Sequence, residues 1–196
     1  MRIKRNEIKT FIQHVEFQGN DKGEKLMEVF ECVSTLSSVR IYDDREAGMD
    51  VIRKVVEAGR LAPSAHNDQP WEFVLITDKT RLREMAKYCI SGSFISQVSF
   101  AVVVLADPDS KWQQIDTTRA AQNMVLTAWS LNLGSCWIGR LDKDGIKNYL
   151  NIPAKWDILT VLPFGYFNKK IVSYKKLRKS PEEVFHLNEY GTKIIE

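Results

Sequence analysis

Apolar residues recur every three or four positions in five segments of the chain, and this spacing predicts five helices. The predicted helices span residues 24–34, 50–61, 80–88, 116–133 and 142–150. Apolar side chains cover more than one side of the longest segment, which indicates a buried central helix. We expect Asp116 to cap its amino end and Gly134 to end it.

Three runs rich in Val, Ile, Leu and Phe are closed by turn residues, and they predict strands at 72–77, 100–106 and 158–166. Two of these runs are almost entirely apolar, so both faces of their sheet must be covered. The pattern therefore favours a sheet packed between helices over an exposed antiparallel sheet.

The first 24 residues differ from the rest of the chain. They are polar, mixed in charge and end in a glycine-bounded turn at residues 19–23, which indicates an N-terminal extension. Residues 25–196 contain no internal repeat and are expected to form one domain.

Composition excludes several classes of protein. With 44% hydrophobic and 27% charged residues the chain is typical of a globular protein, and no apolar run approaches the roughly 20 residues of a membrane span. The amino terminus has no secretory pattern, so we expect a cytoplasmic protein without a membrane partner. A net charge of +3 is too small to indicate nucleic acid binding.

Familiar catalytic and metal motifs are missing from the sequence. The three cysteines and three histidines have no metal-ligand spacing, so we expect no metal site. No acid is identified that could orient His66 toward Ser64 as in a serine triad. There is no G-x-G-x-x-G and no P-loop, so any phosphate must be held by side chains.

Two groups of polar and basic residues could hold such a phosphate. Six basic residues lie without an acid among them at 169, 170, 175, 176, 178 and 179. Such a run suits either a solvated surface or an anion site. Ser37, Ser38 and Arg40 could join Lys176 and Arg178 around a phosphate. Alternatively, Arg40 pairs with Asp43 or Asp44, and the basic run is only solvated.

The segment Ala62–Trp71 contains two prolines that fix its ends and a set of polar residues between them. Ser64, His66, Asn67, Asp68 and Gln69 supply many donors and acceptors. This composition suits recognition of a polar planar ligand, and it equally suits a helix-to-strand turn whose side chains cap backbone groups.

Five motifs occur along the chain in an order that carries a resemblance to a known family. They are Ser-Val-Arg-Ile-Tyr at 38–42, APSAHNDQPWEF at 62–73, Ala-Ala-Gln-Asn-Met at 120–124, Gly-Ser-Cys-Trp-Ile-Gly at 134–139 and Leu-Pro-Phe-Gly-Tyr at 162–166. Over about residues 28–186 the chain resembles the nitroreductase family of flavoproteins. The resemblance implies an α+β fold with a central, mainly antiparallel sheet covered by helices, and two chains that interlock as a homodimer with FMN at their interface.

The resemblance also implies which residues bind FMN. Its phosphate and ribityl chain would be held by residues of the first motif and the basic run, namely Ser37, Ser38, Arg40, Lys176 and Arg178. The ring would be lined by Pro63, Ser64, Ala65, Asn67 and Gln69. Cys136, Trp137, Ile138 and Gly139 would lie along its other edge, with backbone groups near ring atom N5. No catalytic side chain is implied, because the flavin itself carries the hydride.

One position departs from the family pattern. Members of the family usually have two arginines before the serine of the first motif, and this chain has Leu36 and Ser37 there. Each charge-assisted hydrogen bond contributes about 1.5–3 kcal/mol, so we expect weaker FMN binding unless the basic run near Lys176 compensates.

The resemblance implies an FMN-dependent oxidoreductase that moves electrons from NADH or NADPH to nitroaromatics, quinones or similar small acceptors by a ping-pong mechanism. Relatives that remove iodide from tyrosine or break down flavin usually add a lid, and the segment between Tyr88 and Phe100 is short. The departure at Leu36 and Ser37 keeps a second hypothesis open, in which the protein binds or senses a flavin or phosphorylated ligand without turnover.

Overall fold

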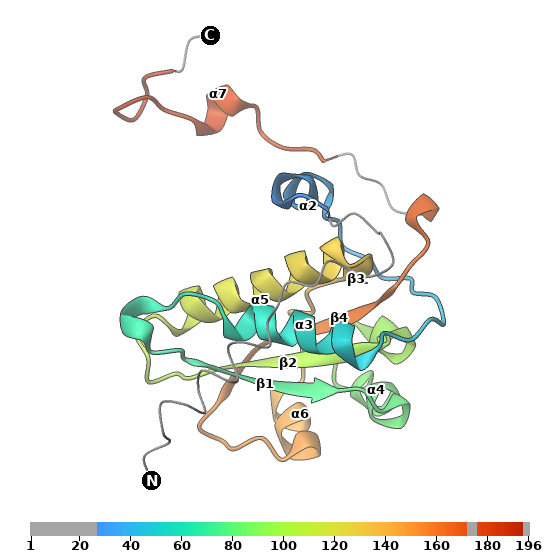
Figure 1. Ribbon diagram of the computed structural model, residues 1–196. Helices are drawn as coiled ribbons and strands as arrows, with labels where there is room; N and C mark the ends of the chain where they lie inside the picture. Colours follow the sequence, from blue (N-terminus) through green and yellow to red (C-terminus); the bar gives the residue numbers. More distant parts are fainter. Residues whose placement is uncertain (1–26, 172–175, 194–196) are drawn as a thin grey trace, which may run out of the picture.

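The computed structural model describes residues 27–171 and 176–193. They form a four-stranded antiparallel sheet in the order β1-β2-β4-β3, with helices on both faces (Figure 1). The strands are β1 (Trp71–Ile76), β2 (Phe100–Ala106), β3 (Leu133–Ser135) and β4 (Asp157–Tyr166). The α-helices are α2 (Val29–Thr35), α3 (Met49–Arg60), α4 (Lys79–Met85), α5 (Gln113–Ser130), α6 (Lys143–Leu150) and α7 (Pro181–Val184). Three short 3-10 helices are η1 (Ala65–Asn67), η2 (Ser93–Gln97) and η3 (Lys169–Ile171).

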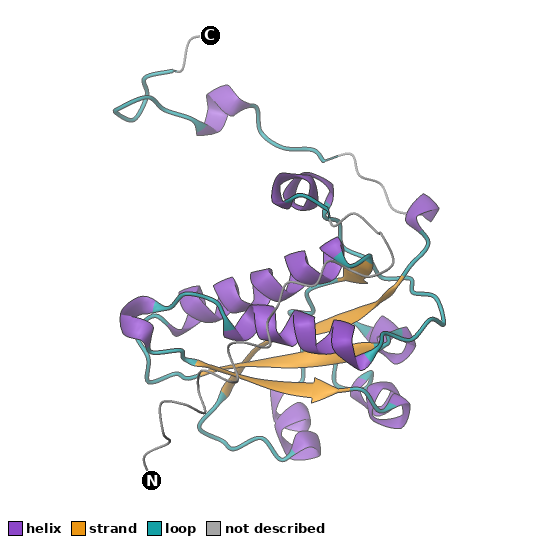
Figure 2. Ribbon diagram, in the orientation of Figure 1, coloured by secondary structure: helices purple, strands orange, loops and turns teal. Residues whose placement is uncertain are grey.

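The central strands explain why their sequences are almost entirely apolar. Every residue of β2 is buried, and successive side chains point to opposite faces. Phe100 and Val102 pack in the cluster that α3 and α5 complete, while Ala101 and Val103 pack in the cluster on the side of α4 and α6. Figure 2 shows these two layers of helix with the sheet between them. The expected α+β arrangement with a covered, antiparallel sheet is confirmed.

Most element boundaries agree with the sequence pattern to within a few residues, and the amino end of α5 is the main exception. The helix begins at Gln113, so the prediction that Asp116 caps it is wrong. Asp116 lies inside the first turns and is 1% exposed, because its carboxylate is used elsewhere. Gly134 does not end the helix either, since it belongs to β3, a strand too short to produce a periodic signal.

Gly134 allows residues 38–40 to lie against β3. Val39 donates its backbone N–H to the Ser135 carbonyl at 2.9 Å, and a Cβ on Gly134 would lie 2.6 Å from Val39 Cγ2. We therefore expect Gly134→Ala to lower the free energy of unfolding by about 1–3 kcal/mol through overpacking. Urea titration measures this loss. Gly139→Ala is the control, because its Cβ would meet nothing closer than 3.9 Å, and an equal loss in both variants would contradict the prediction.

Both ends of the described chain leave apolar side chains uncovered. On α2, Val29 and Phe30 are 75% and 81% exposed, and the predicted start of this helix at 24–26 lies outside the described residues. Residues 176–193 extend away from the sheet and expose Phe185 and Tyr190 (Figure 1). The predicted extension at residues 1–24 also lies outside the described residues. The described part of one chain therefore exposes a considerable apolar surface.

Candidate functional site

The loop Ala62–Trp71, between α3 and β1, is anchored at both ends by α5. Ala62 and Trp71 are buried together against Ala120. Thr117, which is fully buried, donates its hydroxyl to the Pro70 carbonyl at 3.2 Å. The backbone N–H of Ala65 donates to the Asp116 carboxylate at 2.9 Å. Asp116 and Thr117 give no local sequence signal as loop anchors, because their partners lie about fifty residues away in the chain.

The loop holds an unusual backbone conformation. His66, Asn67 and Gln69 have φ angles of 53°, 60° and 51°, in the left-handed region that costs a non-glycine residue about 1–2 kcal/mol. Hydrogen bonds from Asn67 N to the Ser64 carbonyl and from Gln69 N to Ser64 Oγ stabilise this shape. A simple helix-to-strand turn does not require three such residues, so the geometry favours a built binding loop.

The loop directs polar groups outward. His66, Asn67 and Asp68 are exposed, while Ser64 and Ala65 are half-buried. Gln69 donates its side-chain amide to the Asn67 carbonyl at 3.1 Å. The side-chain amide of Asn67 makes no hydrogen bond to any residue that the structure describes. Asn67 therefore offers both a donor and an acceptor to a ligand.

A second group of predicted site residues gathers at the other edge of the sheet. Ser38 forms a parallel bridge with Ser135, and Ile138 N donates to the Val161 carbonyl at 3.1 Å. Burial alternates along the first segment, so Val39 points into the core while Ser38 and Arg40 are exposed. Along the second segment Cys136 and Ile138 are buried, while Trp137 and Gly139 are exposed. The structure thus brings Ser38 beside Ser135, and Ser38, Arg40 and residues 135–139 are together called the Arg40 group.

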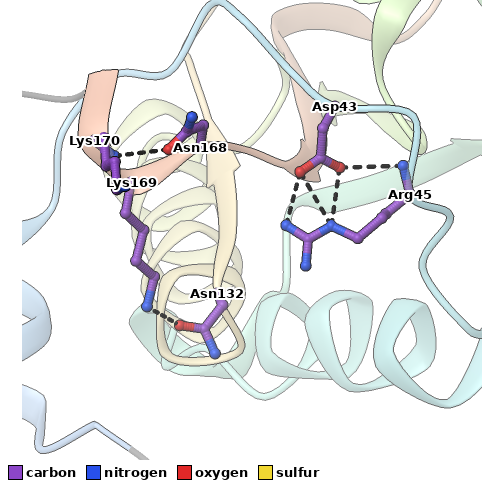
Figure 3. Close-up of polar contacts among 6 residues, drawn as sticks. All are labelled: Asp43, Arg45, Asn132, Asn168, Lys169 and Lys170. Atoms are coloured by element: carbon purple, nitrogen blue, oxygen red, sulfur yellow. Dashed lines mark hydrogen bonds and ion pairs between the residues drawn. The ribbon is translucent and has the colours of Figure 1, made fainter.

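Arg40 is an exposed cation without a partner among residues 27–171 and 176–193. Asp43 pairs instead with Arg45, whose Nε and NH2 groups lie 3.0 and 2.7 Å from Oδ2, and this hydrogen bonding lowers the pKa of Asp43 (Figure 3). Asp44 forms no ion pair among these residues. The alternative in which Arg40 is neutralised by Asp43 or Asp44 is therefore wrong, and the guanidinium is available to an anion.

The basic run after β4 does not converge on one point. Lys169 Nζ donates to Asn132 Oδ1, and the backbone N–H of Lys170 donates to Asn168 Oδ1 (Figure 3). Lys176 donates to the Val33 carbonyl near the end of α2, shortly before the Ser38 segment. Arg178 donates to the Leu177 carbonyl at 2.8 Å on the extended arm. The structure brings Lys176 near the Ser38 segment but not Arg178, and Lys175 lies outside the described residues.

The loop and the Arg40 group lie at opposite corners of the sheet (Figure 1). Trp71 is in register with Ala106 and Asp157, whereas Ser135 is in register with Phe164. Seven residues along β4 span roughly 23 Å, and three strand spacings span roughly 14 Å. Trp71 and Ser135 are therefore roughly 27 Å apart, much farther than the three fused rings of a flavin could reach.

Within residues 27–171 and 176–193 no helix is long and apolar enough to cross a membrane. No group of His, Cys, Asp and Glu among the same residues could hold a metal ion.

A groove of about 400 Å³ lies between α2, α3 and α5, and Met27, Cys32, Leu61 and Leu126 line it. It is mainly apolar and contains none of the predicted site residues.

Comparison with known proteins identifies relatives along most of the chain. The model of the nitroreductase family matches residues 36–107 and 93–166. A protein of Archaeoglobus fulgidus with the provisional name NADH dehydrogenase/NAD(P)H nitroreductase is 33% identical over 149 residues, which cover 71% of this chain and 85% of the relative.

Solved structures agree with this result. A Bacteroides thetaiotaomicron protein with the same provisional name is 29% identical, with a TM-score of 0.73 over 83% of this chain and 98% of its own. An FMN-dependent nitroreductase from Clostridium difficile R20291 is 26% identical, with a TM-score of 0.68 over 81% and 98%. The fold predicted from the order of the motifs is confirmed.

Proposed function

This chain belongs to the nitroreductase family, and from that premise we propose that it is an FMN-dependent oxidoreductase using NADH or NADPH. Its acceptor would be a nitroaromatic, a quinone or a similar small molecule. The observation that carries the proposal is Arg40, an exposed guanidinium with no ion pair among the described residues, two positions after Ser38, which bridges Ser135. This donor set suits a phosphate at the edge of a planar ligand.

The residues present fit FMN in chemical type. Arg40 and Ser38 would hold its phosphate, with Lys176 near enough to add a second charge.

The polar edge of the ring would be hydrogen-bonded by Asn67 and Ser64. Asn67 has a side-chain amide that is free among the described residues, and the Ser64 hydroxyl still has a proton to donate. Pro63, Ala65 and Gln69 would complete that wall, and Cys136 to Gly139 would form the opposite one. FMN, when bound, supplies electron transfer between the nicotinamide and the acceptor.

The protein would act as a homodimer, with each site built from both chains. Trp71 at the end of the loop and Ser135 in the Arg40 group are roughly 27 Å apart in one chain, so a single ring can contact both regions only if they come from different chains. The exposed apolar side chains of α2 and of residues 176–193, and the apolar groove near α5, would be covered in the same assembly. An apolar surface of this kind favours association with a second copy.

Proton transfer by a dedicated side chain is not required in this proposal. His66 is exposed and hydrogen-bonds no carboxylate among the described residues, so nothing orients it as a general base. The protein would instead position the two substrates in turn, and Arg40, Lys176 and loop amides would stabilise negative charge. Binding of the two substrates in turn at the same site is consistent with ping-pong turnover.

The visible spectrum of purified protein tests the proposed function. After incubation with FMN and removal of the excess, we expect about one bound flavin per chain, bleached by NADH or NADPH without oxygen and restored by a quinone or nitroaromatic. Protein that retains no flavin would contradict the proposal. Protein that stays yellow after both nucleotides would support the alternative, a flavin-binding or sensing protein without turnover.

A further inference from the structure

Asp116 is a buried carboxylate whose two oxygens have different partners. Oδ2 accepts the backbone N–H of Ala65 at 2.9 Å, and Oδ1 accepts from Arg119 NH1 at 3.0 Å. Asp116 is 1% exposed, while the Arg119 side chain is 52% exposed. The guanidinium therefore neutralises the charge from the solvent side, and the other oxygen remains directed at the loop.

The position of Ala65 makes this contact important. Ala65 lies between Ser64 and His66, at the point where the backbone enters its left-handed stretch. A non-glycine residue keeps this left-handed conformation only where surrounding contacts hold it there. Within the described residues, the Asp116 bond is the side-chain contact from outside the loop that reaches this stretch, since Thr117 and Ala120 hold only its ends.

We propose that Asp116 is a positioning residue of the flavin site, which fixes the backbone at Ala65 so that Ser64 and Asn67 face the ring. Asp116 is too buried to touch a ligand itself, so it acts through the loop. This inference rests on the proposed function, because it assigns the loop to the flavin. A helix N-cap was the role expected from the sequence, and the loop contact replaces it.

Asp116→Ala tests the proposal by two measurements. Hydrogen exchange of the peptide that carries Ala65, measured without added FMN, is expected to become at least about tenfold faster. The dissociation constant for FMN, measured by flavin fluorescence, is expected to rise by about tenfold or more. Asp116→Asn keeps an oxygen that can accept the Ala65 N–H, and we expect it to restore most of both properties.

Two further variants separate positioning from general destabilisation. Asp78 is a matched control, because its carboxylate also accepts a backbone N–H, from Arg81 at 2.8 Å, at the amino end of α4. Asp78→Ala should leave exchange at Ala65 and FMN affinity within about twofold of wild type. Arg119→Ala removes the solvent-side partner only, so the loop bond and its exchange protection should persist.

The outcomes distinguish this inference from the function on which it rests. Wild-type protein that binds no FMN would overturn the proposed function, and the inference with it. Wild-type protein that binds FMN, with Asp116→Ala binding equally tightly, would overturn the inference alone. If Asp116→Ala does not fold, Asp116→Asn alone tests the inference. Near-normal FMN affinity together with near-normal exchange protection at Ala65 would support a positioning role for Asp116. Normal protection at Ala65 with reduced FMN affinity would oppose that role.

Discussion

Replacing Arg40 by alanine is expected to weaken FMN binding by between about 10-fold and 100-fold. Arg40 has no ion pair or hydrogen bond within the described residues, so its removal breaks no such contact among them. A charge-assisted hydrogen bond to phosphate contributes about 1.5–3 kcal/mol, and each 1.4 kcal/mol changes affinity about tenfold. Titration of the apoprotein with FMN, followed by fluorescence, measures the change.

Arg45→Ala is the matched control for Arg40→Ala. It removes the same charge five residues away, but Arg45 is already paired with Asp43 and lies over the Tyr166 ring. We expect this variant to bind FMN within about threefold of wild type, because the Arg45 guanidinium is already paired and is not free to bind the phosphate. If both variants lost affinity equally, the effect would come from net charge, and Arg40 would have no specific role.

Co-expression of two single variants tests whether each site is shared between chains. A dimer of one Arg40→Ala chain and one Asn67→Ala chain would contain one site with both defects and one site with neither. Half of its sites should therefore bind FMN with wild-type affinity. If each site were formed within one chain, every site would carry one defect, and no wild-type affinity would remain.

Phe164→Ala is expected to have the largest effect on stability. Phe164 is fully buried, and its ring stacks on Phe100 with centroids 4.9 Å apart. Truncation of a buried phenylalanine costs about 3–5 kcal/mol through lost burial and the cavity that remains. Phe164 is also in register with Ser135, so its loss should loosen the segment that carries Ser38 and Arg40.

Urea unfolding followed by circular dichroism measures the loss in Phe164→Ala. Leu75→Ala serves as the control, because Leu75 lies on the edge strand β1 and is 38% exposed. Its truncation should cost about 1 kcal/mol or less. A loss below about 1 kcal/mol for Phe164→Ala would mean that the two-layer core is not organised around the Phe100–Phe164 pair.

The departure at Leu36 and Ser37 has a clear structural consequence. Leu36 is half-buried against the apolar cluster that contains Cys32 and Val39, and Ser37 donates its hydroxyl to the Thr35 carbonyl at 3.3 Å. Neither residue supplies a charge, so Arg40 and Lys176 are the cations near this segment in the described chain. Under the proposed function, FMN affinity should therefore depend strongly on Arg40.

Local sequence patterns were sufficient for most of the secondary structure. The strand at 100–106 and the helix ending at Leu150 follow directly from residue spacing. A buried strand face or helix face requires apolar residues at regular spacing among neighbouring positions. Asp142 also caps α6, accepting from Gly145 N at 3.0 Å. The order of the five motifs led to the family, and the fold followed from it.

Other features depended on contacts between residues far apart in the chain. That Arg40 does not pair with Asp43 depended on competition for this carboxylate, which binds Arg45 because the backbone N–H and the side chain of Arg45 both reach it. The role of Asp116 depended on a bond across 51 positions. Strand β3 was too short to be seen before its pairing with β4 was known.

The sequence by itself determined the helices, the central strands, the family and the residue types of the proposed flavin site, because these depend on local spacing and on motifs. Only the tertiary structure decided that the loop and the Arg40 group lie at opposite corners of the sheet, since strand order and register set that separation. Only the tertiary structure, likewise, turned Asp116 from an expected helix cap into the anchor of the loop, because a buried carboxylate takes the nearest unpaired N–H.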